Sequence, residues 1–227
     1  MKTRDRILLT SLELFNERGE RNVTTNHIAA HLNISPGNLY YHFRNKPDII
    51  YQLFLEYEKL VDHYLQVPED RPLTVEDKVA YLETVFDGLW SYRFFHRDLE
   101  FLLDCDERLR RDYRAFTVRC LQAIVAILKG LRSGGILREQ PDADFQSMAL
   151  NVWLVITNWM AFLKTAHAGE ENEAITLQQL KQGIYQVLTL SLPFVTEAYE
   201  SRVREARAAY QPDAFGLGGT FRIDGCP

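Results

Sequence analysis

The stretch TTNHIAAHLNISPGNLYYHFRNKPDII, residues 24–50, decides the fold of the N-terminal part of this chain. It predicts two short helices joined by a tight turn. Ser35 is a favourable N-cap residue, and Pro36 follows at the first helical position, where its missing N–H costs nothing. Asn33 can adopt the left-handed backbone conformation that a tight turn between helices requires. We therefore expect one helix that ends before Asn33 and a second that begins at Pro36.

The second of these helices has an exposed face that packing explains poorly. On a wheel of 3.6 residues per turn, Leu39 and Phe43 fall together on the buried side, while Gly37 and Tyr41 point away from it. A short helix held by two apolar side chains has no structural reason to present aromatic rings to water. A ligand surface explains them better, because the second helix of a helix-turn-helix motif lies in the major groove of DNA. The sequence therefore predicts a DNA-binding domain.

The same stretch resembles a known family. It is similar to the DNA-binding region of TetR-type (TetR/AcrR-like) transcriptional regulators, and the resemblance is specific over about residues 4–54. The chain departs from the family at Asn33, where glycine is usual, although asparagine meets the same backbone demand. The resemblance implies a homodimer that binds double-stranded DNA at a pseudo-palindromic operator. We expect a repressor that a small-molecule effector releases from this operator.

Hydrophobic periodicity predicts helices along the whole chain and almost no strands, so we expect an all-α fold. The expected organisation is a three-helix helix-turn-helix head over residues 1–46 and a larger helical bundle for ligand binding and dimerisation over residues 47–210. Residues 211–227 contain four glycines and are expected to form a mobile tail. We expect a final helix that begins with a Thr176–Gln179 capping box, carries Leu177, Leu180, Ile184, Leu188 and Leu192, and is kinked by Pro193.

The wheel and the resemblance together select nine residues for DNA contact. Two of them begin the first helix of the motif and are expected to contact phosphates, with plain N-capping as the alternative. Four are expected to face bases or the adjacent backbone, and three are expected to hold phosphates at the rim. For the histidine among them, a bond within the domain is the alternative. The residues, in that order, are Thr24 and Thr25; Ser35, Gly37, Asn38 and Tyr40; and Tyr41, His42 and Lys46.

Charge is unevenly distributed along the sequence. Residues 1–46 contain seven basic and four acidic residues, a net charge of +3, and the rest contains 19 basic and 27 acidic residues, a net charge of −8. A basic segment on an acidic body indicates a polyanionic partner at one end of the protein. Chance asymmetry of the surface is the alternative.

A second group of residues is expected to bind the effector. The body is rich in aromatic side chains, and the resemblance implies that some of them line a cavity for a small apolar or aromatic molecule. An ordinary core position is the alternative for each. The sequence does not identify the effector. The candidates are Trp90, Tyr92, Phe95, His96, Phe101, Phe116, Cys120, Asn151 and Trp153.

The last two predicted helices are expected to form the dimer interface. Apolar residues occupy more than one face of residues 145–163, so this helix needs cover on two sides, which one chain rarely supplies. Pairing it and the final helix with their symmetry mates gives a four-helix interface like that of the family. We therefore expect an obligate homodimer. The expected interface residues are Val152, Ile156, Trp159, Leu163, Leu180, Ile184 and Leu188.

Other functions have weaker support in the sequence. It contains no P-loop, GxSxG, HExxH or paired-carboxylate motif, so we predict neither enzymatic activity nor a cofactor. His27 and His31 have the i, i+4 spacing of metal ligands, but no third ligand is evident and no metal site is predicted. A helical scaffold that binds only protein, or a regulator without a small-molecule effector, is the alternative.

Cysteine usage and hydropathy bear on the compartment. The three cysteines lack CxxC spacing, and the charged N-terminus is not followed by the apolar segment of a signal peptide. The most apolar run, residues 149–163, falls short of the roughly 20 residues that a membrane-spanning helix needs. We therefore expect a cytoplasmic protein without a membrane partner.

Overall fold

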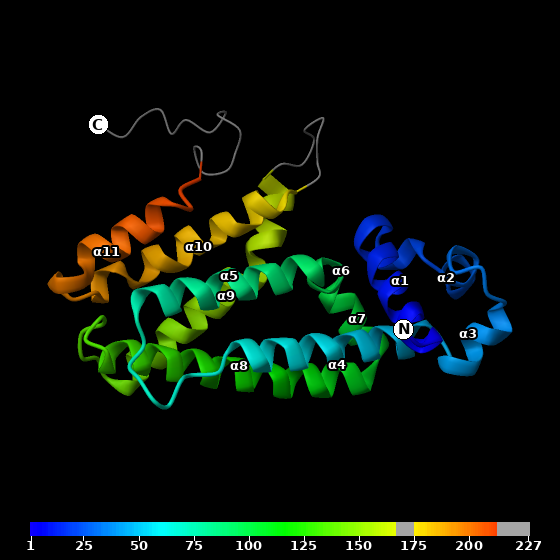
Figure 1. Ribbon diagram of the computed structural model, residues 1–227, viewed down its shortest axis with the longest axis horizontal. Helices are drawn as coiled ribbons and strands as arrows, with labels where there is room; N and C mark the ends of the chain where they lie inside the picture. The colour runs from blue at the N-terminus through cyan, green and yellow to red at the C-terminus, as the bar shows by residue number, and fades with distance from the viewer. Residues whose placement is uncertain (167–174, 213–227) are drawn as a thin grey trace. The chain divides into compact units, whose positions relative to one another are not determined.

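The computed structural model describes residues 1–166 and 175–212. Within these ranges the protein is all-α, as predicted (Figure 1). The only β-type pairing in these ranges is a backbone bridge between Leu137 and Val195. None of the helices there combines the length and the apolar character needed to cross a bilayer. The elements are α1 (Thr3–Arg18), η1 (Glu20–Asn22), α2 (Thr25–His31), α3 (Pro36–His42), α4 (Lys46–Tyr64), α5 (Val75–Ser91), α6 (Arg93–Arg97), α7 (Leu99–Cys105), α8 (Glu107–Ser133), α9 (Asp142–Ala166), α10 (Leu177–Ser191), η2 (Leu192–Phe194) and α11 (Glu197–Ala208).

The chain divides into two compact units. The first unit comprises residues 1–63 and 91–118, and the second comprises residues 64–90 and the described residues from 119 onward. The boundary expected after residue 46 falls inside the first unit, because most of α4 and all of α6 and α7 belong to the same unit as α1–α3. The expected tail lies almost entirely outside the described residues.

Local signals in the quoted stretch form the helices that they predict. The Thr24 hydroxyl accepts the backbone N–H of His27, and the His27 ring accepts the N–H of Thr24, which completes a capping box for α2. The Ser35 hydroxyl caps α3 by accepting the N–H of Asn38. Between the two helices, Asn33 is the one non-glycine residue of the described chain with positive φ, at 54°. The predicted turn is therefore confirmed.

Aromatic rings form much of the core of the first unit. Phe54 on α4 stacks on Phe95 with 5.7 Å between ring centroids and meets the edge of Phe116 at 5.9 Å. Phe94 connects α6 to α1 through Phe15, at 5.2 Å. Offset and edge-to-face contacts of this kind add about 0.5–1.5 kcal/mol per pair to the gain from apolar burial. The rings thereby join α4, α6 and the first part of α8 within this unit.

Helices α9 and α10 pack closely in the second unit. A Cβ at Gly183 would lie 2.6 Å from two ring carbons of Phe86 and 2.8 Å from the Trp159 ring, so only glycine fits there without displacing them. Lys78 is buried in the same core, where its ammonium donates a hydrogen bond to the Ser191 hydroxyl. Burial lowers the pKa of Lys78 to about 8, because the charged form loses its hydration.

The C-terminal end of the second unit differs from the sequence expectation. The Thr176–Gln179 capping box is confirmed, but α10 ends at Ser191 and is followed by η2, which contains Pro193. A further helix, α11, then packs along α10 (Figure 1). Its one buried apolar residue is Val203, and the rest of its sequence is strongly polar. A sequence with so weak an apolar stripe gave little signal for a packed helix.

Candidate nucleic-acid interface

The exposed face of α3 is the most distinctive surface of the first unit. Leu39 is fully buried and Phe43 nearly so, whereas Tyr41 is 86% and Tyr40 47% exposed. Gly37 and Asn38 are exposed as well. The predicted wheel is therefore confirmed, since Leu39 and Phe43 are buried while Gly37 and Tyr41 face water.

Helices α2 and α3 are joined on this surface by side chains expected to contact DNA. The hydroxyl groups of Thr25 and Tyr40 lie 2.9 Å apart. The ring of Tyr41 meets the half-buried ring of His42 edge-on, with 5.1 Å between centroids. These contacts preorganise polar groups in front of α3. Thr24 serves as the N-cap of α2, the alternative that the sequence left open for it, and Ser35 caps α3 as predicted; both stay exposed.

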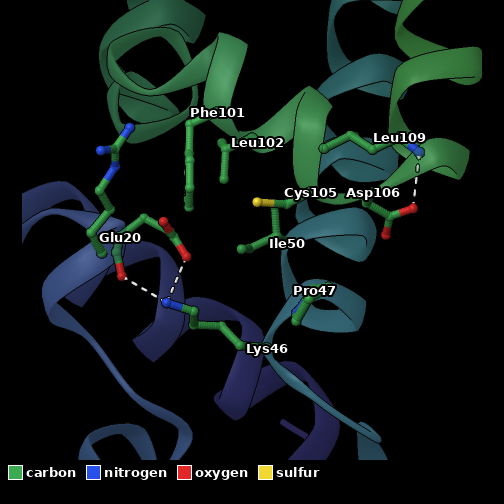
Figure 2. A pocket seen from close by; sticks show the side chains of 10 residues that line it. Glu20, Lys46, Pro47, Ile50, Phe101, Leu102, Cys105, Asp106 and Leu109 are labelled. Atoms are coloured by element: carbon green, nitrogen blue, oxygen red, sulfur yellow. Dashed lines mark hydrogen bonds and ion pairs between the residues drawn. The ribbon is translucent and has the colours of Figure 1, made fainter.

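The predicted phosphate contact by Lys46 requires correction. Its ammonium donates to the backbone oxygens of Glu20 at 3.0 Å and Val23 at 3.1 Å and pairs with the Glu20 carboxylate at 2.6 Å (Figure 2). All the polar contacts of this ammonium are thus made inside the domain. The Lys46–Glu20 ion pair ties the start of α4 to η1, and the hydrogen bond to Val23 ties it to the residue that precedes the α2 N-cap. Sequence reasoning gave Lys46 an external role because it could not see the buried carboxylate.

Arg44 is an exposed cation that the residue selection missed. It lies two residues beyond the end of α3, and its side chain makes no ion pair or hydrogen bond within residues 1–166 and 175–212. It counted toward the basic charge of the first 46 residues, which was the signal that could have identified it. Arg4 is less available, because it lies over the Phe43 ring at 5.2 Å and donates to Gln52.

The candidate effector residues do not gather into one site. Four of them, Tyr92, Phe95, His96 and Phe116, surround Tyr57 of α4, with ring centroids 5.0 to 6.4 Å from the Tyr57 ring. Tyr57 itself was not among the candidates. We call these five residues the Tyr57 cluster.

His96 is the polar member of the Tyr57 cluster. Its Nε2 lies 3.0 Å from the Tyr57 hydroxyl, while its buried Nδ1 has no hydrogen-bond partner. Burial lowers the pKa of His96 to about 4, so the ring is neutral at neutral pH. A neutral imidazole with one unused nitrogen can bind a polar group of a ligand.

The other five candidates lie apart from this cluster. Phe101 lines a separate cavity beside Glu20, described below. Trp90 and Trp153 are partly buried against the core of the second unit, and Cys120 is a buried residue of α8. Asn151 is exposed on α9, so its expected place in an interior pocket is corrected.

The expected dimer interface also requires correction. Six of its seven residues are buried within the chain itself, and the seventh, Trp159, is partly buried and donates its indole N–H to the Gln179 carbonyl oxygen. They form the contact between α9 and α10 rather than a free surface. The side of α9 that faces outward carries Leu150, Leu154 and Phe162, which are 47%, 49% and 43% exposed. Periodicity indicated two apolar faces, but it could not tell which one the chain covers.

Two family models match this chain. Residues 7–53 match the one described as bacterial regulatory proteins, tetR family, and residues 56–203 match the one described as bacterial transcriptional repressor. Among curated relatives, an HTH-type transcriptional regulator of Staphylococcus aureus (strain MRSA252) is 27% identical over 115 residues, 50% of this chain and 60% of that protein. Another, from strain USA300, is 30% identical over 107 residues, 47% of this chain and 54% of that protein. The chain therefore spans little more than half the length of these relatives.

Solved structures extend the similarity over nearly the whole chain. A TetR-family transcriptional regulator from Marinobacter aquaeolei VT8 is 67% identical with a TM-score of 0.87, over 93% of this chain and 100% of that chain. A putative transcriptional regulator from Saccharomonospora viridis, solved in complex with choline, is 21% identical with a TM-score of 0.65, over 86% of this chain and 98% of that chain, and shows the fold alone. Together with the exposed face of α3, these matches establish that the chain belongs to the TetR family, whose members are transcriptional regulators with an N-terminal helix-turn-helix domain.

Proposed function

We propose that this protein is a homodimeric repressor that binds a pseudo-palindromic operator through α3 and leaves it when a small effector binds. The observation that carries the proposal is the outward face of α3, where Tyr40 and Tyr41 are exposed although only Leu39 and Phe43 anchor the helix. Such a face can reach base edges and phosphates in the major groove. Since its ligand is operator DNA, we place the protein in the cytoplasm.

The proposed DNA contacts are of two kinds, contacts with bases and contacts with phosphates. Gly37, Asn38 and Tyr40 are proposed to read bases, because they lie on the exposed side of α3. Tyr41 and Arg44 are proposed to hold phosphates, Tyr41 through its exposed hydroxyl and Arg44 through an unpaired guanidinium. Thr24, Thr25, Ser35 and His42 complete the surface. Lys46 is not part of it.

The dimer is proposed to form through the outer face of α9. Leu150, Leu154 and Phe162 recur at multiples of four residues, with Asn158 at the remaining position, and so follow one stripe of the helix. A second copy of this chain fits such a stripe, because a two-fold axis places identical apolar patches against each other. Two subunits present two recognition helices, which explains the need for a pseudo-palindromic site.

The effector is proposed to be a small apolar or aromatic molecule that inserts at the Tyr57 cluster. The support is a set of aromatic rings around one neutral histidine with an unused nitrogen. Tyr57 and Lys46 lie on the same helix, 11 residues or roughly 16 Å apart at the helical rise. A shift of α4 at Tyr57 therefore reaches the Lys46–Glu20 ion pair. To release a mostly bound operator, the effector must favour the released state by about 5 kcal/mol.

Fluorescence anisotropy with a labelled fragment of the protein's own promoter tests this function. We expect binding that weakens steeply with salt, a footprint with two half-sites, and two subunits per site by light scattering. A chain that stays monomeric at micromolar concentration and does not bind the fragment at low salt would contradict the proposal. Mass spectrometry of small molecules that copurify with the protein would identify the effector.

A further inference from the structure

We propose that the first unit contains a small-molecule site separate from the Tyr57 cluster, and that it takes a neutral aromatic molecule with one hydroxyl or N–H donor, of the phenol or indole class. The site is a cavity of about 300 Å³ between η1, the start of α4 and α7. This volume is at the lower end of the range for ligand pockets, ~300–1,000 Å³.

Apolar side chains form the walls of this cavity (Figure 2). Ile50 comes from α4, Phe101 and Leu102 from α7, and Leu109 from α8. The guanidinium of Arg21 lies over the Phe101 ring, 4.1 Å from its centroid. The ring of a ligand would lie against the four apolar side chains and would remove itself and the 39% exposed Phe101 from water.

One buried polar atom gives the site its chemistry. Glu20 is only 2% exposed, and its carboxyl group points toward the middle of the lining side chains (Figure 2). Its Oε1 accepts from Lys46, while the buried Oε2 has no hydrogen-bond partner in the described structure. A buried oxygen without a hydrogen bond is unfavourable, more so when it carries charge, and a ligand donor would remove this cost. The cavity therefore favours a molecule that can donate one hydrogen bond.

The charges of Lys46 and Glu20 favour a ligand whose hydrogen-bond donor is neutral. The Lys46 ammonium lies 2.6 Å from Glu20 Oε1 and already balances the carboxylate, so a second cation at Oε2 would be repelled by it. An anion would face the carboxylate itself. A neutral hydroxyl or indole N–H meets neither penalty.

Cys105 provides a direct readout. Cys105 is an exposed residue, and its sulfur points toward the other lining side chains of the cavity (Figure 2). An occupant should therefore slow the alkylation of this thiol. Cys120 is buried, and Cys226, which lies outside the described residues, can be replaced by serine.

The test compares 2-naphthol with 2-methoxynaphthalene, which has the same rings and no donor. In the Cys226→Ser protein we expect saturating 2-naphthol to slow alkylation of Cys105 by iodoacetamide at least fivefold. We expect calorimetry to show 2-methoxynaphthalene binding at least tenfold more weakly and 2-naphthoate not binding. Cys105→Trp, which fills the cavity, should abolish binding of 2-naphthol. Val118→Trp, at a half-exposed position of α8 outside the lining, should not.

Equal affinity for the alcohol and the ether would overturn the role of Glu20. Undiminished binding to Cys105→Trp, or no protection of Cys105, would overturn the site itself. The protection experiment needs no bulky substitution, so a folding defect in Cys105→Trp would leave it decisive. No DNA is present in these measurements, so their failure would leave the proposed operator binding untouched.

Discussion

The hydroxyl oxygens of Thr25 and Tyr40 lie 2.9 Å apart and join the first residue of α2 to the exposed side of α3. This hydrogen bond fixes the position of the Tyr40 ring in the protein without DNA. For Tyr40→Phe we expect a loss of stability of about 0.5–1.5 kcal/mol, the net contribution of one hydrogen bond. We also expect altered preference among operator variants, because Tyr40 lies on the face proposed to read bases. Denaturant unfolding and anisotropy with single-base substitutions measure the two effects, and an unchanged ranking of operators would exclude base reading by Tyr40.

Tyr41 gives a contrasting expectation, because its ring is almost entirely exposed. Tyr41→Ala should change the free energy of unfolding by less than about 0.5 kcal/mol. Its affinity for the operator and for unrelated DNA should fall by similar factors, since a phosphate contact carries no sequence information. Anisotropy titrations with both DNAs test this. A loss confined to the operator would mean that Tyr41 reads bases.

Substitutions at Lys46 and at Arg44 should have different effects, the first on stability and the second on DNA binding. Lys46→Met leaves the Glu20 carboxylate buried without its partner, so we expect a loss of about 3 kcal/mol in the free energy of unfolding. The double change Lys46→Met with Glu20→Leu should regain much of it. Arg44→Ala should leave stability unchanged and lower the salt slope of DNA binding by about 1. If Arg44→Ala binds DNA with the same affinity and salt slope as the wild type, Arg44 does not contact a phosphate.

Lys78 predicts how stability depends on pH. Its folded-state pKa of about 8 is below the ordinary value of 10.5. Between these values the unfolded chain holds a proton that the folded chain has lost, so raising the pH through this window stabilises the fold. The gain is about 3 kcal/mol at 1.4 kcal/mol per pKa unit. Chemical denaturation from pH 7 to 10.5 measures it against Lys78→Met, which removes the contribution of this group. Parallel curves for the two proteins would contradict the burial of a charged Lys78.

The outer face of α9 is testable by one substitution. Leu154→Glu places a charge in the middle of the exposed stripe and should convert the dimer to monomers, with loss of operator binding but little change in helicity. Val118→Glu is the matched control, because Val118 is 50% exposed on α8. Light scattering and circular dichroism distinguish the outcomes. A dimeric Leu154→Glu protein would place the interface on another surface.

Local chemistry made the head predictable from sequence. A proline at the first helical position, hydroxyl N-caps and an asparagine suited to positive φ are effects within a few residues, and each of them acts in the structure as expected. The exposure of Tyr41 also followed from helical spacing, because only Leu39 and Phe43 could anchor so short a helix.

Long-range pairing was beyond the reach of sequence. Nothing in the sequence assigns Lys46 to Glu20, 26 residues away, and so its charge was interpreted as available to DNA. The same holds for α9, where the choice between two apolar faces depends on where α10 packs. Tyr57 was missed for a related reason, since its neighbours are set by tertiary contacts, whereas Arg44 could have been identified from the basic charge of the first 46 residues.

The close fit of Gly183 beneath Phe86 and Trp159 has a consequence for divergence. A methyl group can enter that position only if one of the two rings shrinks at the same time. Related sequences that drift at position 183 should therefore carry a compensating smaller residue at position 86 or 159, and a comparison of many such sequences would reveal the linkage as paired substitution.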